Sequence, residues 1–134
     1  MGRIIHVELT STDVDRTAVF YAKAFGWTTE ASPFIGGYLV ASTGEGDGID
    51  GAIMSRQYQQ QPAIAWVEVD DLDATLAAVA DAGGSAASDP QELPGVGRLA
   101  YVRDPDGTLV ECVSRCEVSR RRCRCGGPGP GRRR

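Results

Sequence analysis

The stretch Ile4-Ile5-His6-Val7-Glu8-Leu9, near the start of the chain, alternates apolar and polar side chains. This alternation is typical of a β-strand with one buried face, and it places Ile5, Val7 and Leu9 opposite His6 and Glu8. A capping residue among Ser11–Asp13, followed by an apolar stripe that ends at Gly26, predicts a helix directly after this strand. The first 26 residues therefore predict a strand–helix unit.

The same unit returns about 60 residues later. Ile64-Ala65-Trp66-Val67-Glu68-Val69 is again a strand, a cap at Asp70 or Asp71 follows, and the second helix stops at Gly83-Gly84. Short, glycine-bounded strands come after each helix, at residues 37–43, 49–54, 85–87, 97–103 and 108–113. The sequence therefore predicts an α+β fold of two βαβββ modules, at about 4–56 and 63–114. We expect a cupped, paired mixed sheet with the helices on its convex side, and core packing for Phe25 and Trp27.

Charge is distributed unevenly along the chain. The net charge is −11 over residues 1–114 and +7 over residues 115–134, which together give −4. An acidic body argues against nucleic acid as a specific partner. The apolar runs are shorter than the ~18 residues of a membrane span, and no secretory signal opens the chain, so we expect a cytoplasmic protein without a membrane partner.

Residues 115–134 are rich in Arg, Gly, Pro and Cys and hold one valine, so we expect a disordered tail outside the domain. A solvated extension is the first interpretation of this tail. Non-specific binding of polyanions is an alternative. The cysteine spacings, without paired knuckles, disfavour zinc.

The body resembles the glyoxalase / bleomycin-resistance / extradiol-dioxygenase superfamily, also called the vicinal oxygen chelate (VOC) fold. In the first half the resemblance lies in residues 6–9, 13–16, 20–21 and 25–27. In the second half it lies in residues 69–74, 83–84, 94–98 and 104–107. The resemblance implies the paired modules already predicted, and it leaves the activity open, because lyases, dioxygenases, epimerases, thiol transferases and drug-sequestering proteins share this fold.

The resemblance also implies metal ligands on the first and last strands of each module. His6 and Glu111 match two of these positions, and their atoms suit Zn, Fe, Mn or Ni. The matching position in the second module is Ile64, and the end of the first module offers only Asp50, out of register. A catalytic metal usually has three protein ligands, so this set is deficient. A metal-free catalytic acid/base role for His6 and Glu111, or a remnant role, stays open.

The remaining candidates are expected in the concave cup. Trp66, Tyr38, Met54 and Tyr101 are predicted to bind a ligand through an apolar cleft with few polar groups. Glu8 and Glu68 recur at corresponding places in the two modules, and we interpret them as solvated charges at the cup rim. A ligand-binding carboxylate pair or substitute metal ligands are the alternatives.

Three functions are compatible with these residues. The leading hypothesis is a small-molecule-binding protein that holds an aromatic or amphipathic ligand, such as a drug or natural product. The alternative is a divalent-metal-dependent lyase, isomerase or dioxygenase that uses His6 and Glu111. The third is a metal-free enzyme with one of these residues as general base. We expect a homodimer, because open concave sheets need covering, and the sequence leaves open whether the modules pair within or between chains.

Overall fold

The computed structural model describes residues 2–115. Within them the elements follow the predicted order of two modules. The first module consists of β1 (Arg3–Ser11), α1 (Val14–Phe25), β2 (Thr28–Ala31), β3 (Tyr38–Ser42) and β4 (Gly51–Ser55). The second consists of β5 (Ala63–Glu68), α2 (Leu72–Asp81), β6 (Ser85–Ala86), β7 (Gln91–Leu93), β8 (Gly97–Arg103) and β9 (Leu109–Arg115).

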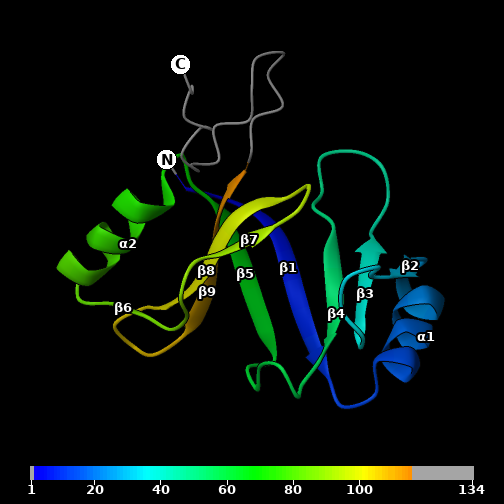
Figure 1. Ribbon diagram of the computed structural model, residues 1–134. Coiled ribbons are helices and arrows are strands. Elements are labelled where there is room, and N and C mark those ends of the chain that lie inside the picture. The colour runs from blue at the N-terminus through cyan, green and yellow to red at the C-terminus, as the bar shows by residue number, and fades with distance from the viewer. Residues whose placement is uncertain (1, 116–134) are drawn as a thin grey trace, which may run out of the picture.

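All described strands belong to one mixed sheet, in the order β2-β3-β4-β1-β5-β9-β8-β6, with β7 paired to β8. Each module places its last strand parallel to its first, β4 beside β1 and β9 beside β5. The modules join where β1 pairs antiparallel with β5 of the same chain, so pairing within the chain is what the structure shows. The sheet curls into a half-barrel, with α1 and α2 at its opposite ends (Figure 1). The predicted α+β fold of two βαβββ modules is confirmed.

Both helices begin at the aspartates expected as caps. The Asp13 carboxylate accepts a hydrogen bond from the Arg16 amide, and Asp71 accepts one from the Ala74 amide, which satisfies a free amide in each first turn. Gly26 ends α1 in the left-handed conformation, with φ of 75°. Helix α2 ends slightly earlier than predicted, at Asp81.

Strands β2 and β7 are absent from the sequence prediction. Both are short and polar, and β2 lies at a sheet edge, so neither shows the apolar alternation that marks a half-buried strand. Strand β9 runs to Arg115, one residue into the segment predicted as tail. The tail prediction from residue 116 on, including its cysteines and their zinc or polyanion roles, lies outside the described residues.

The convex face of the second module packs against α2. Leu72 forms a buried cluster with Ala100 and Val102 of β8 and Cys112 of β9. Helix α1, by contrast, contains no buried residue. The prediction that Phe25 packs in the core is wrong: it is 64% exposed, and its ring contacts are with Tyr21 and Trp27.

Among the described residues, no helix is long and apolar enough to cross a membrane.

Gly51 tests the close contact between β1 and β4. A Cβ at this position would lie 2.5 Å from the Val7 carbonyl oxygen, whereas one at Gly48 would meet nothing within 4 Å. We expect Gly51→Ala to lower the free energy of unfolding by about 1–3 kcal/mol, because the backbone of β1 has to shift. Urea unfolding measures it, with Gly48→Ala as the matched control. Equal stability of the two variants would contradict this close approach.

Candidate functional site

The registers of the sheet place the predicted site residues in a row across four strands. His6 of β1 pairs with Trp66 of β5, Trp66 with Glu111 of β9, and Glu111 with Tyr101 of β8. Residues that are paired across strands point to the same face of a sheet. One face of the sheet therefore carries all four side chains side by side.

This face forms the floor of a cavity of about 550 Å³. The lining includes His6, Glu8, Tyr38, Met54, Trp66, Tyr101 and Glu111, so seven of the eight predicted residues lie together. The eighth, Glu68, is not in the lining. The cavity is thus built by both modules of one chain.

A second row explains the burial of Glu8. Ala52 on β4 and Ile64 on β5 lie on either side of it, and all three residues are at most 1% exposed. The interpretation of Glu8 as a solvated charge is therefore wrong. These two neighbours are apolar, so Glu8 finds its polar partner on the cavity floor. There the Tyr101 hydroxyl donates a hydrogen bond to Glu8 Oε1 at 3.0 Å.

Glu8 and Glu111 form a buried carboxyl pair. Glu111 is 2% exposed and within hydrogen-bonding reach of Glu8. Burial, the charge of Glu8 and contact with the Glu8 side chain raise the pKa of Glu111 to about 9, while the neighbouring Tyr101 hydroxyl acts in the opposite direction. At neutral pH Glu111 therefore holds a proton that an ordinary carboxyl would lose.

His6 lies beside this pair in an apolar setting. Its ring centre is 4.6 Å from that of Trp66, and its Nε2 is 3.4 Å from the Tyr38 hydroxyl. Burial lowers the pKa of His6, against the opposing effects of Glu8 and Asp50. Near neutral pH the imidazole is therefore uncharged, with one nitrogen able to accept a proton.

The two tyrosines keep their protons. Burial, together with the carboxylates Glu8 and Glu111, raises the pKa of Tyr38 and of Tyr101 above the ordinary phenol value. Both hydroxyls therefore act as hydrogen-bond donors toward the floor of the cavity.

Glu68 lies apart because it does not correspond to Glu8. The capping aspartates Asp13 and Asp71 each follow a matching strand position by seven residues, which makes Ile64 the counterpart of His6 and Trp66 the counterpart of Glu8. The repeat that relates Glu8 to Glu68 is thus offset by two residues. Glu68 instead forms an ion pair with Arg115 at 3.1 Å, with both side chains largely exposed to solvent.

The same correspondence locates the four metal-ligand positions that the family resemblance implies. Glu111 lies opposite Trp66, and its counterpart Ala52 lies opposite Glu8. Of the four positions, His6 and Glu111 have donor atoms, whereas the side chains of Ala52 and Ile64 have none. Asp50 is engaged elsewhere, as its Oδ1 accepts a hydrogen bond from the Thr43 amide at 2.9 Å.

Within residues 2–115, no three His, Cys, Asp or Glu side chains are grouped so that they could hold a metal ion. A catalytic divalent metal usually takes three protein ligands. The donor set of the cavity therefore does not fit a resident metal of that kind.

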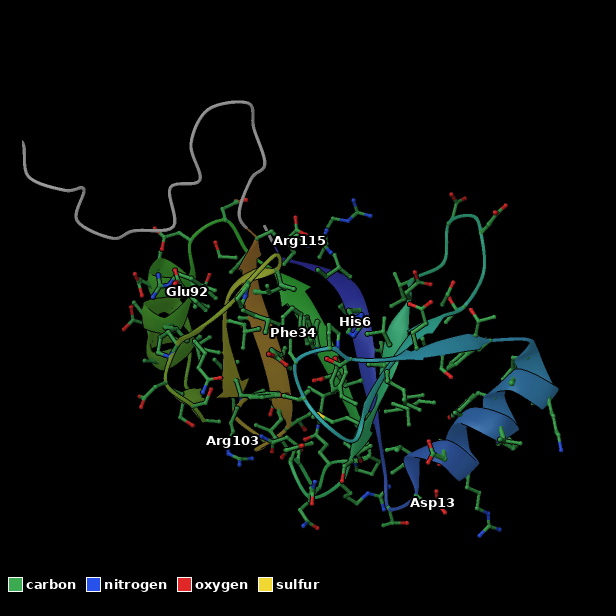
Figure 2. The ribbon with its side chains drawn as sticks, turned by 45° about the vertical axis from the view of Figure 1, so that its right-hand side comes forward. His6, Asp13, Phe34, Glu92, Arg103 and Arg115 are labelled. Atoms are coloured by element: carbon green, nitrogen blue, oxygen red, sulfur yellow. The ribbon has the colours of Figure 1, made fainter. Side chains whose placement is uncertain are left out.

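Several parts of the lining were not foreseen from the sequence, including β7 and the turn that follows it. The β2–β3 loop brings Phe34 and Ile35 to the cavity, and in Figure 2 this loop crosses in front of the strands, with His6 behind it. Ser32 Oγ accepts hydrogen bonds from the amides of Phe34 and Ile35 and shapes the loop. The sequence signal for this loop was its apolar pair, Phe34 and Ile35, which stands between a proline and two glycines.

Ile5 is a further addition to the lining. It was expected on the face opposite His6, but the pairing of β1 with β5 shifts by one residue between Ile4 and His6. This irregularity interrupts the strict alternation and brings Ile5 to the cavity beside His6.

Comparison with known proteins agrees with this architecture. The family model described as Glyoxalase/Bleomycin resistance protein/Dioxygenase superfamily matches residues 3–112. The chain therefore belongs to this superfamily, as the sequence resemblance implied.

Two named relatives match most of this chain. A probable lactoylglutathione lyase of Vibrio parahaemolyticus is 30% identical over 132 residues, which cover 88% of this chain and 94% of that protein. A putative glyoxylase of Mycobacterium bovis is 32% identical over 114 residues, 84% of this chain, but the match spans only 44% of that longer protein.

The solved structures support the fold. Methylmalonyl-CoA epimerase from Mycobacterium tuberculosis superposes with a TM-score of 0.64 at 16% identity, covering 84% of this chain and 87% of that one. At this identity the likeness describes the architecture.

The raised pKa of Glu111 makes stability depend on pH. From the ordinary carboxyl range up to about pH 9 the folded state holds a proton that the unfolded state has released, so the free energy of unfolding falls as pH rises through this window. We expect Glu111→Gln, which has no proton to lose, to gain about 4 kcal/mol relative to the wild type between pH 5 and pH 8, at about 1.4 kcal/mol per pH unit. Urea unfolding at both pH values measures this.

Glu45→Gln is the matched control, because Glu45 is exposed in the loop between β3 and β4. Its unfolding free energy should follow the wild type at both pH values. A parallel pH dependence of Glu111→Gln and the wild type would show that Glu111 titrates as an ordinary carboxyl.

Proposed function

We propose that this chain is an enzyme of the lyase or isomerase class that moves a proton on a small, largely apolar, oxygen-bearing molecule bound in the cavity. The observation that carries this proposal is the buried carboxyl pair of Glu8 and Glu111 on the cavity floor. The names of the relatives, a lactoylglutathione lyase and a glyoxylase, favour an enzyme over a binding protein.

The chemistry follows from the unequal states of the two carboxyl groups. Two adjacent carboxyls in one apolar site cannot both ionise easily, so one serves as acid while the other serves as base. In the proposal Glu111, whose pKa is raised, is the acid, and Glu8 beside it is the base. A substrate with an acidic C–H beside a carbonyl could give a proton to Glu8 while Glu111 donates one to the oxygen.

His6 and the tyrosines assist this transfer in the proposal. The neutral imidazole of His6 can exchange a proton with substrate on the other side of Trp66. Tyr101 holds Glu8 Oε1 in place, and Tyr38 does the same for the His6 ring. These hydrogen bonds fix the base before substrate enters, which lowers the reorganisation needed during the reaction.

The metal-dependent lyase, isomerase or dioxygenase implied by the superfamily is a separate form of enzyme. Because Ala52 and Ile64 offer no donor atoms, the proton transfer proposed above takes place without a metal. Elemental analysis of protein purified without a metal-affinity tag distinguishes the two, since a metal-dependent enzyme needs close to one divalent ion per chain.

A binding protein for an aromatic or amphipathic molecule is the second candidate. Trp66, Phe34, Met54 and Tyr58 lie in the lining, and such a surface holds flat apolar molecules without chemistry. This candidate differs from the first in predicting binding without turnover.

Solvent exchange at carbon tests the enzymatic proposal. In D₂O with a chelator present, we expect the wild type to catalyse incorporation of deuterium next to the carbonyl of at least one member of a panel of small ketones and aldehydes. Glu8→Gln and Glu111→Gln should each lower this rate by about 100-fold or more, since each removes one proton carrier. Proton NMR measures the exchange.

Glu68→Gln is the control, because Glu68 is a carboxylate outside the cavity lining, paired with Arg115, and the rate of this variant should match the wild type. Binding of panel members without any exchange would favour the second candidate. Exchange that the chelator abolishes would favour the metal-dependent form.

The homodimer and the cytoplasmic location stay proposals. The exposed rings of Phe20 and Phe25 on α1, 58% and 64% exposed, support a surface that a second chain could cover. We expect sedimentation equilibrium at micromolar concentration to give twice the mass of the chain. A single-chain mass would contradict the dimer.

A further inference from the structure

The indole N–H of Trp66 is a buried donor without a partner. Trp66 is 9% exposed, and its Nε1 has no hydrogen-bond acceptor among the described residues. Buried tryptophan N–H groups nearly always have an acceptor, because leaving one unpaired destabilises the folded protein by about 1–3 kcal/mol. An unpaired donor in the wall of a cavity therefore indicates an acceptor that arrives with a ligand.

The position of Trp66 decides where this acceptor would lie. Trp66 pairs directly with Glu111 on β9, and its ring contacts His6. Glu111 Oε2 is likewise buried and without a partner. An oxygen bound to the indole N–H would thus be next to the carboxyl pair, at the centre of the row that spans the floor.

The charges of the lining limit what can carry this oxygen. Three carboxyl side chains, Glu8, Glu92 and Glu111, line the cavity. Within the described part of the chain the lining has one arginine or lysine, Arg115, which is already paired with Glu68. An anionic group placed among these carboxyls would be repelled and would lack a counter-ion.

We propose that Trp66 is a specificity-determining residue whose N–H binds the carbonyl oxygen of an uncharged, ring-containing ketone, and that the cavity excludes anionic analogues of the same shape. This inference rests on the proposed function, since it names the substrate class of the same site. The rings lie against the apolar wall of Phe34, Met54 and Leu99, while the carbonyl reaches the floor.

Three bicyclic probes of one shape separate these contributions. They are 1-tetralone, which has the carbonyl, tetralin, which lacks it, and tetralin-1-carboxylate, which is an anion. Calorimetric titration of the wild type should give about tenfold tighter binding of 1-tetralone than of tetralin. The carboxylate should bind at least about tenfold more weakly than 1-tetralone.

Trp66→Phe keeps an aromatic ring and removes the N–H. We expect it to weaken binding of 1-tetralone by about tenfold and to change binding of tetralin by less than about twofold. Trp27→Phe is the matched control, because Trp27 stacks on Tyr21 away from the cavity, and its affinities should equal those of the wild type. A purely structural role of Trp66 would weaken ketone and hydrocarbon alike.

A measurement on the wild type covers the case in which Trp66→Phe does not fold. The Trp66 indole N–H signal, identified in Trp27→Phe as the remaining one, should move downfield with 1-tetralone and not with tetralin. Equal responses to the two probes, equal affinity for the carboxylate, or no binding of any probe would overturn the inference. The proposed function is judged separately, by deuterium exchange across the wider carbonyl panel.

Discussion

The antiparallel pairing of β1 with β5 is the constraint on which the site depends. It joins the two modules within one chain and fixes which side chains share a row, so His6, Trp66, Glu111 and Tyr101 face the same cavity from four strands. Because successive strand residues point to opposite faces, a slip of one residue in this pairing would turn His6 to the face opposite Trp66, Glu111 and Tyr101. The registers therefore specify the site before any hydrogen bond is considered.

Burial of two carboxyl groups in this floor creates a tension between stability and chemistry. Charged groups in an apolar setting destabilise a fold unless they are compensated, and here the compensation is the proton held by Glu111 and the Tyr101 hydroxyl that binds Glu8. The same surroundings hold Glu111 protonated and His6 neutral at a pH where exposed groups would not be. Reactive protonation states are in this way a direct result of where the sheet places these residues.

The fold and the side chains on the cavity floor could be predicted from the sequence, because both follow from strand alternation, capping aspartates and the repeat. Features that depend on three-dimensional neighbours could not. The burial of Glu8 depends on Ala52 and Ile64 from other strands, the entry of Ile5 on a register shift, and the position of Glu68 on a two-residue offset between modules. The exposure of Phe25 shows that an apolar stripe on a helix identifies a face that is able to be buried. It does not show that the folded chain buries that face.

The place of β1 in the middle of the sheet has a consequence for synthesis. The first module is complete once β4 has left the ribosome, but β1 then has an unpaired edge until residues 63–68 follow. An unpaired strand edge is a template for any matching strand. The nascent chain therefore relies on the shortness of the β4–β5 connection, residues 56–62, to bring its own β5 to that edge ahead of a strand from another molecule.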